Sequence, residues 1–220
     1  MRLIVFDMDG TLIDTHALIA EHMGTAFLGA GLAAPTAEAS RRIIGLSLPI
    51  AIGKLAQSAD PVLIDTLVES YKHHYRASLL KADDREPLFP GAREALDRLR
   101  AVSGTALGIA TGKGLAGVNR ILGLHRLGDY FVTLQTPDHN PSKPHPGMLL
   151  SAMKATGARP EETVMIGDTV FDMDLAAAAG VAAIGVAWGY HEPAELIEAG
   201  AVEMIESYAQ LDEAIVRALD

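Results

Sequence analysis

The sequence of 220 residues contains no cysteine. Disulfide bonds and catalysis by a thiol are therefore excluded. The same absence says little about the compartment, because disulfide-free proteins occur in oxidising and in reducing ones. Positive charge is also scarce, since 18 Lys and Arg stand against 28 Asp and Glu and give a formal net charge of -10. A protein of this charge is poorly suited to bind a polyanion, so we expect no nucleic-acid partner.

Long hydrophobic runs are missing as well. The longest uncharged stretch, 175–190, is shorter than the ~20 residues that a membrane-spanning helix needs. We interpret it as a helix end, a turn and a buried strand, and we expect no membrane partner. Only a short apolar run precedes Asp7, without the basic, apolar and small-residue order of a signal peptide. These features predict a cytoplasmic protein.

Short apolar runs alternate with helical patterns along most of the chain. The runs that predict strands are 3–6, 105–110, 130–134, 163–166, 182–187 and, more weakly, 201–205. The helical patterns outside the N-terminal third are 91–101, 115–122, 147–156, 170–179, 193–199 and 208–219. This alternation predicts the α/β class, with a doubly wound parallel sheet of the Rossmann-like kind. Ligands of such sheets bind beyond the carboxyl ends of the strands.

The stretch 16–86 lacks convincing strands. Its helical patterns are 17–28, 37–44 and 62–80. Turn-forming residues flank it, with Asp14 on one side and Pro87 and Pro90 on the other. With 49% hydrophobic residues, the chain can bury a sizeable core and carry an insertion. We therefore predict a core of residues 1–14 and 87–220 with an all-helical cap domain, 15–86, inserted in it.

Two aspartates follow the first apolar run and lead into a turn. Asp7 and Asp9 are followed by Gly10 and Thr11. On a continued strand the two carboxylates would lie side by side as like charges, which is unfavourable without a cation. A turn at Gly10 and a bound metal relieve this repulsion. We predict that Asp7 is a nucleophile toward phosphorus and that Asp9 is the general acid and base.

Three further motifs follow in order along the chain. They are Thr111-Gly112-Lys113 after the run 105–110, then Ser142-Lys143-Pro144-His145-Pro146, and then Gly167-Asp168-Thr169-Val170-Phe171-Asp172 after the run 163–166. Together with Asp7–Thr11, they resemble the four motifs of the haloacid dehalogenase superfamily. The resemblance covers most of the chain, and it implies a Rossmann-like core with a helical cap inserted just after the first motif.

Asp168 and Asp172 are candidate metal ligands. They are four residues apart, so a helix that begins near Thr169 would place both on one face near its N-terminus. Ordinary capping of that helix would explain them as well. Beside Asp7, however, Asp168 completes an all-oxygen site of the kind that Mg2+ prefers. The family resemblance adds the backbone carbonyl of Asp9, and Asp172 as a partner, so the predicted metal residues are Asp7, Asp9, Asp168 and Asp172.

Two lysines compete for the role of a positive clamp on the phosphoryl group. Lys143 lies in a proline-rich segment and matches the lysine of the family, so we assign to it the neutralisation of the nucleophile and the transferred group. We interpret Lys113 as a surface lysine at the beginning of a helix. The segment 108–114 is no nucleotide-binding loop, because its glycine spacing is one residue short and Gly114 follows the lysine.

Phosphate binding is assigned to Gly10, Thr11, Thr111 and Gly112. Gly10 lacks a side chain, which lets the backbone approach a phosphate. Thr111 ends a predicted strand, where its hydroxyl and the next amides can bind a phosphate oxygen or simply cap the helix. The family usually carries asparagine after this threonine. With Gly112 in its place, a side-chain contact is lost or replaced by the backbone.

The beginning of the predicted cap offers a further candidate. His16 lies just past the first motif and within reach of a substrate, so we include it among the substrate-binding residues. We expect Asp14 to cap the helix that begins there. Five cap residues could form a substrate-facing edge, although a solvated helical face explains them equally: Arg41, Arg42, Gly45, Ser47 and Lys54.

Within the family, the pattern is most similar to the phosphoglycolate phosphatase branch. It predicts a Mg2+-dependent phosphatase, monomeric or homodimeric, that hydrolyses 2-phosphoglycolate or a similar small phosphorylated metabolite through an aspartyl phosphate. The cap would close over the substrate and exclude water. Alternatives are a phosphomutase of the β-phosphoglucomutase kind, a nucleotidase or pyrophosphatase of the same family, and a receiver-like Mg2+-binding signalling module. Asp9 disfavours a carbon–halogen hydrolase and a phosphonate-cleaving enzyme.

Overall fold

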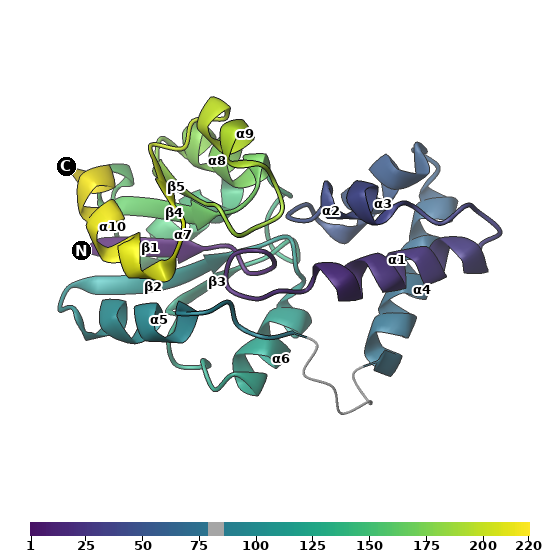
Figure 1. Ribbon diagram of the computed structural model, residues 1–220, viewed down its shortest axis with the longest axis horizontal. Helices are drawn as coiled ribbons and strands as arrows, with labels where there is room; N and C mark the ends of the chain where they lie inside the picture. The colour runs from purple at the N-terminus through teal and green to yellow at the C-terminus, as the bar shows by residue number, and fades with distance from the viewer. Residues whose placement is uncertain (79–85) are drawn as a thin grey trace.

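The computed structural model describes residues 1–78 and 86–220 (Figure 1). Its strands are β1 (Arg2–Phe6), β2 (Thr105–Ala110), β3 (Thr133–Gln135), β4 (Thr163–Gly167), β5 (Ala182–Val186) and β6 (Glu203–Ile205). Its α-helices are α1 (His16–Gly29), α2 (Ala37–Arg41), α3 (Leu48–Ala56), α4 (Pro61–Ser78), α5 (Ala92–Ala101), α6 (Leu115–Leu124), α7 (Gly147–Thr156), α8 (Val170–Ala179), α9 (Pro193–Glu198) and α10 (Leu211–Leu219).

The strands form one parallel sheet in the order β3-β2-β1-β4-β5-β6. β1 lies between β2 and β4, so the winding reverses direction there. In open α/β sheets the crevice at such a reversal, beyond the carboxyl ends of the strands, is the usual ligand site. The predicted α/β class and doubly wound parallel sheet are confirmed.

Alternate residues of β1 enter two separate hydrophobic cores. Ile4 and Phe6 pack with α5, α6 and α10 on one face of the sheet. Leu3 and Val5 pack with α7, α8 and α9 on the other face. Successive side chains of a strand point to opposite faces, and a parallel sheet covered on both faces needs apolar residues on both. The uninterrupted run Leu3–Phe6 therefore places the end of β1 firmly at the centre of the molecule.

Helices α1 to α4 form a layer of their own beyond the carboxyl ends of the strands, which we call the helical layer (Figure 1). It has its own hydrophobic cluster, in which Met23 and Phe27 of α1 pack with Leu67 of α4. Tyr190, from the segment after β5, packs into the same cluster. The helical layer is thus stabilised both by its own core and by contact with the sheet-containing part.

Some element boundaries differ from the sequence-based expectations. The third strand is Thr133–Gln135 rather than 130–134, and α2 ends at Arg41 rather than at residue 44. Helix α3 was not among the expected helices, although Pro49 in its first turn is a common helix-start signal. The last two residues of the expected helix 62–80 lie outside the described residues.

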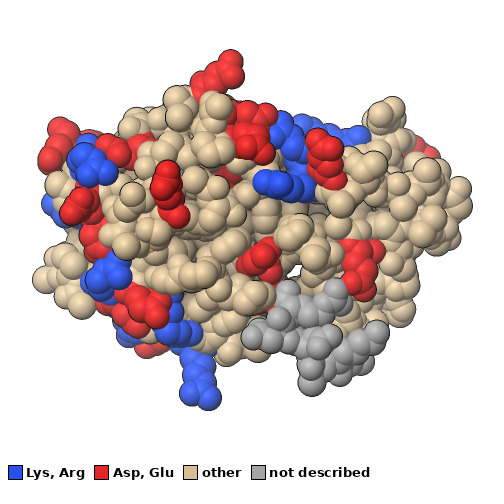
Figure 2. Space-filling model, viewed as in Figure 1, with Lys and Arg blue, Asp and Glu red and all other residues tan. Residues whose placement is uncertain are grey.

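Acidic side chains are scattered over the face of the molecule drawn in Figure 2, and on this face the basic side chains form no continuous surface among the described residues. That distribution agrees with the net charge of -10. Within the same part of the chain, every helix is too short or too polar to span a bilayer.

Candidate active site

β1 ends in a tight turn that presents Asp7 at the centre of the sheet edge. The carbonyl of Met8 accepts hydrogen bonds from the amides of Leu12 and Ile13, at 2.9 and 3.0 Å. Gly10 has a φ of 89°, and a Cβ atom at this position would collide with the carboxylate of Asp168. This backbone region is favourable only for glycine. The Asp-Gly-Thr sequence therefore makes a turn that brings the first and the last acidic motifs together.

Three carboxylates meet at this turn. Asp7, Asp168 and Asp172 are buried, and one oxygen of each lies within 4.8 Å of the others. Lys143, from the loop before α7, is also buried, and its Nζ lies 3.0 Å from Asp7 Oδ2 and 2.5 Å from Asp172 Oδ1. We call these four residues the acidic centre. Its members are far apart in sequence, and the predicted assembly of Asp7, Asp168, Asp172 and Lys143 is what the structure contains.

Burial dominates the electrostatics of the acidic centre. It raises the pKa of Asp7 to about 7, although the Lys143 ammonium acts in the opposite direction. Burial, with the charges of Asp172 and Asp7, raises the pKa of Asp168 well above its usual value. For Lys143, burial favours the neutral amine, but Asp172 and Asp7 outweigh it and raise the pKa. The centre therefore holds more negative charge than one lysine can neutralise.

This excess is what a divalent cation would balance. Asp7 Oδ2 is buried and makes no hydrogen bond with the described residues, although Lys143 is near it. Carboxylate oxygens are the ligands that Mg2+ prefers, and it binds through a few of them while keeping water molecules. The donor set and the unpaired oxygen fit a Mg2+ ion held by Asp7, Asp168 and Asp172.

Thr11 supports the acidic centre from the turn. Its hydroxyl donates to Asp168 Oδ1 at 2.7 Å. Its carbonyl accepts from Trp188 Nε1 at 3.1 Å and from Tyr208 Oη at 2.8 Å. Thr111, directly after β2, is also buried; its hydroxyl oxygen accepts a 3.3 Å hydrogen bond from the amide of Lys113, and its side chain acts to lower the pKa of Asp7. Both threonines therefore lie where the sequence places them, at the edge of the carboxylate cluster.

The side chain of Asp9 points away from the three carboxylates. Its Oδ1 accepts a 2.7 Å hydrogen bond from the hydroxyl of Thr15 and lies 3.1 Å from Lys113 Nζ. This leaves only the backbone carbonyl of Asp9 for the predicted metal contact. The interpretation of Lys113 as a surface lysine is wrong, because only 12% of its side chain is exposed. Although burial opposes it, the charge of Asp9 raises the pKa of Lys113.

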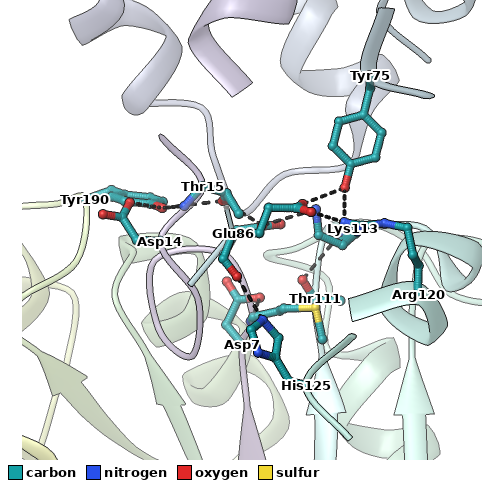
Figure 3. A network of polar contacts seen from close by, with 12 residues as sticks. Asp7, Asp14, Thr15, Tyr75, Glu86, Thr111, Lys113, Arg120, His125 and Tyr190 are labelled. Atoms are coloured by element: carbon teal, nitrogen blue, oxygen red, sulfur yellow. Dashed lines mark hydrogen bonds and ion pairs between the residues drawn. The ribbon is translucent and has the colours of Figure 1, made fainter. Parts of the chain in front are cut away.

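Lys113 also connects to a group of residues that joins the helical layer to the sheet-containing part (Figure 3). Its Nζ lies 5.5 Å from the centroid of the Tyr75 ring on α4. Tyr75 Oη donates to Glu86 Oε1 at 2.7 Å and accepts from Arg120 of α6 at 2.8 Å. Arg120 also forms an ion pair with Glu86. We call Asp9, Tyr75, Glu86, Lys113 and Arg120 the boundary network.

Gly112 lies directly under the loop that follows α2. A Cβ atom at this position would lie far inside 3.0 Å of the carbonyl oxygens of Gly45 and Leu46. Gly112 therefore permits a close approach of backbone to backbone, which is a common reason for glycine. Whatever contact an asparagine makes at this position in other members of the family, this chain fills the space with the helical layer.

The beginning of α1 differs from the expectation. Asp14 does not cap the helix: its Oδ1 lies 3.0 Å from His16 Nδ1 and accepts from Tyr190 Oη at 3.4 Å. Thr15 occupies the N-cap position, but its hydroxyl donates to Asp9 and makes no capping hydrogen bond to α1. His16 is more than half exposed and rests beside Tyr190. Its predicted contact with a substrate stays a prediction.

The basic residues of the expected substrate-facing edge hold the helical layer in place instead. Arg42 makes two hydrogen bonds to Glu195, of 2.5 and 2.7 Å, and Arg41 donates to the carbonyl of Gly189 at 3.2 Å. Lys54 lies over the ring of Phe171. These side chains contact α9, the segment between β5 and α9, and the beginning of α8, so they dock one part of the molecule on the other.

A cavity of about 730 Å3 lies between the helical layer and the strand ends. Asp9, Thr111 and Lys113 line it from the sheet-containing part, and Gly45 and Ser47 line it from the helical layer. A cleft of this size between two layers is the usual form of a small-molecule site. The cavity therefore gives a ligand access to the edge of the acidic centre.

The family model described as haloacid dehalogenase-like hydrolase matches residues 4–186. A protein from Dickeya dadantii named probable phosphatase IndB is 35% identical over 214 residues, which cover 95% of this chain and 91% of that protein. A protein from Pseudomonas putida named phosphoglycolate phosphatase is 30% identical over 86% of this chain and 71% of its own length. A crystal structure of a hydrolase from Pseudomonas syringae is 25% identical, covers 99% of both chains and has a TM-score of 0.86.

This chain belongs to the haloacid dehalogenase-like hydrolase family. The resemblance seen in its motifs is confirmed, and so is the prediction of an enzyme of this family. The relatives named above carry phosphatase names.

Sequence reasoning missed Thr15 and three members of the boundary network, Tyr75, Glu86 and Arg120, and it misplaced Lys113 at the surface. The position of Lys113 could have indicated a site residue, because it lies just beyond the carboxyl end of a strand, where ligands of such sheets bind. Tyr75 and Glu86 carry no such signal, since they approach Asp9 and Lys113 only through the packing of α4 on the sheet-containing part.

Proposed function

We propose that this hydrolase is a Mg2+-dependent phosphatase that hydrolyses a small phosphomonoester through an aspartyl phosphate on Asp7. The observation that carries the proposal is the buried Asp7 carboxylate, one oxygen of which has the Lys143 ammonium 3.0 Å away and accepts no hydrogen bond from the part of the chain that the structure describes. A carboxylate oxygen attacks phosphorus, the bond from phosphorus to the ester oxygen breaks, and one difficult step becomes two easier ones.

Asp9 is suited to move the proton in both steps. It protonates the leaving alkoxide first and then takes a proton from the water that cleaves the aspartyl phosphate. The hydroxyl of Thr15 and the ammonium of Lys113 hold its carboxylate beside the cavity. Lys143 offsets negative charge on Asp7 and on the transferred group.

Asp7, Asp168, Asp172 and the backbone carbonyl of Asp9 are the residues that would hold Mg2+. The bound ion would stabilise negative charge on the phosphoryl oxygens. The helical layer acts as a cap that shields the reacting groups from bulk water. The bounds 15–86 of this cap domain stay a prediction from the sequence, and residues 79–85 lie outside the described residues. Thr111 and the backbone at Gly10, Thr11 and Gly112 supply donors for the phosphate.

The relatives' names make 2-phosphoglycolate the reference substrate. The test is phosphate release from a panel of phosphorylated metabolites with and without Mg2+, without a bisphosphate activator. Activity should require the metal, disappear with EDTA and return with Mg2+. Asp7→Asn should lower kcat at least about a thousandfold, whereas Asp174→Asn, an exposed aspartate near the start of α8, should not. Full activity in Asp7→Asn would rule out the nucleophile.

A requirement for a bisphosphate activator would instead favour the phosphomutase alternative. Asp9→Asn should slow formation and hydrolysis of the aspartyl phosphate and leave Mg2+ affinity nearly unchanged. A cytoplasmic location and a monomeric or homodimeric state stay predictions from the sequence.

A further inference from the structure

The cavity is larger than a two-carbon substrate requires. Its volume of about 730 Å3 lies within the range of roughly 300 to 1,000 Å3 that holds drug-sized ligands. Under the proposed function the phosphate lies toward Asp7, at the end of the cavity that Asp9 and Thr111 line. The rest of the cavity extends into the helical layer, between α1, the loop after α2, and α4. This part of the cavity is therefore available to the group that leaves from phosphorus.

The walls of that space are mainly apolar. The helical layer contributes these side chains to it: Ile19, Met23, Ile43, Ile44, Leu46 and Ala51. Tyr71 and Tyr75 of α4 add two aromatic rings, which lie nearly parallel with their centroids 6.2 Å apart. Apolar walls stabilise apolar groups, and aromatic faces suit planar ones. The lining thus favours a leaving group with a ring.

Basic side chains around the cavity are already committed to other partners. Three of the four in the described lining are in ion pairs: Lys72 with Glu69, Lys113 with Asp9 and Arg120 with Glu86. The fourth, Arg76, is exposed, so it offers a cation only on the solvent-facing side of the cavity. A carboxylate that enters between the apolar walls leaves that side and loses its partner, and burial of an unpaired charge is costly.

We propose that the preferred substrates are phosphomonoesters whose leaving group is uncharged, contains a ring and is larger than glycolate. The ring packs between α1 and α4, with the phosphate over Asp7. This inference rests on the proposed phosphatase function and specifies the substrate class of the same site.

Four primary alkyl phosphates separate size from charge. Ethyl phosphate is small and has an uncharged leaving group, and 2-phosphoglycolate is small with a carboxylate. Benzyl phosphate is large with an uncharged leaving group, and 4-carboxybenzyl phosphate is large with a carboxylate. With Mg2+ present, kcat/KM for benzyl phosphate should exceed each of the other three at least about tenfold, since pocket contacts of one ring are worth this much or more.

A preference for 2-phosphoglycolate over benzyl phosphate would overturn this inference and leave the phosphatase function standing. Hydrolysis of none of the four, or of any other phosphomonoester in the panel, would overturn both.

A pair of variants on α3 tests the location of the leaving group. Leu48 lines the cavity and is partly exposed, so Leu48→Lys adds a cation to its wall. Ile50 is 44% exposed and lies outside the cavity lining, so Ile50→Lys is the matched control. Leu48→Lys should shift the ratio of kcat/KM for 4-carboxybenzyl over benzyl phosphate upward by about fivefold or more. The control should keep the wild-type ratio, and an equal ratio in both variants would overturn the proposal.

Discussion

The acidic centre and the boundary network both contain a lysine beside an aspartate, but they are built differently. In the acidic centre, Asp7 directly follows β1 and Asp168 directly follows the neighbouring parallel strand β4. Lys143 lies beside Asp7 with almost no solvent exposure. In the boundary network, Lys113 is partly exposed and its partners include Tyr75, which belongs to the helical layer. The first cluster is a property of the sheet, and the second exists only where two layers meet.

Because one cluster is built at the sheet edge and the other between two layers, we expect the two clusters to have different roles. Under the proposed function, the acidic centre supplies the charge for chemistry on phosphorus. Its members are held by the strand ends, by the loop before α7 and by the first turn of α8. The boundary network forms only when the helical layer lies against the sheet-containing part, because Tyr75 of the layer contacts Lys113 and Arg120 of the other part. Variants in the two clusters should therefore fail in different ways.

The largest contrast is expected between the two lysines. Lys143→Met leaves Asp7 and Asp172 as buried neighbouring charges without a counterion, so kcat should fall about a hundredfold or more, and the metal-free protein should lose about 3 kcal/mol of unfolding free energy. Lys113→Met removes a more exposed pair and should lower kcat about tenfold, with a smaller loss of stability. Phosphate release and urea unfolding measure both, and equal losses would contradict the comparison.

The pH dependence of stability should identify the acidic centre in metal-free protein. The pKa of Asp7 is raised to about 7 by burial, so the folded state binds this proton more tightly than the unfolded chain does. The stability that this group contributes is present at low pH and is lost as the pH rises from about 4 to about 7. Relative to wild type, Asp7→Asn should gain unfolding free energy across this range. Saturating Mg2+ should flatten the wild-type slope, and identical slopes with and without the metal would contradict the assignment.

A milder test addresses the close approach of the helical layer. Gly112→Ala places a methyl group against the carbonyls of Gly45 and Leu46, so the layer must move away and KM should rise roughly three- to tenfold, with a smaller change in kcat. Gly114→Ala is the control, because its nearest contact would be an ordinary 3.5 Å to Asp138. Steady-state kinetics and thermal unfolding of both variants check this, and equal KM values would show that the layer adapts freely.

The smallest effect is expected for the exposed ion pair between Arg42 and Glu195. Pairs of this exposure contribute about 0 to 1 kcal/mol, so Arg42→Ala should change the unfolding free energy by no more than that. KM should rise about twofold or less. Arg100→Ala, which breaks an exposed pair with Asp129 inside the sheet-containing part, should match it in stability and leave KM unchanged. A KM increase as large as that of Gly112→Ala would mean that this pair, too, controls docking.

Much of the acidic centre could be predicted because its signals are local. Asp7 and Asp168 each follow an apolar run that can only be a buried strand, and the parallel order of strands brings their ends to one edge. Gly10 indicated a turn because glycine adopts backbone angles that other residues avoid, and its φ is indeed positive. The alternation of strands and helices followed from the same periodicity, whereas the order of the strands in the sheet was not predicted.

The assembly of the boundary network could not be predicted, because it depends on the position of α4 relative to α6 and to Lys113. Tyr75 of α4 meets Arg120 of α6 and Lys113 only when the helical layer is packed on the sheet-containing part. Tyr75 and Arg120 carry no pattern that separates them from ordinary residues of an amphipathic helix. The sequence predicts that the asparagine contact at Gly112 is lost or replaced by backbone, but nothing local shows that the backbone of residues 45 and 46 occupies the space beside it. Asp14 was expected to cap α1, yet Tyr190, from a distant segment, lies close enough to bind it.

The carbonyl of Thr11 has a consequence for how the molecule is made. It accepts hydrogen bonds from Trp188 and Tyr208, which lie 177 and 197 positions further along the chain. During synthesis these two hydrogen bonds can form only after residues 188 and 208 have been made, although the local bonds within the turn do not depend on them. A chain that stops before residue 188 therefore lacks both distant donors to the turn that carries Asp7.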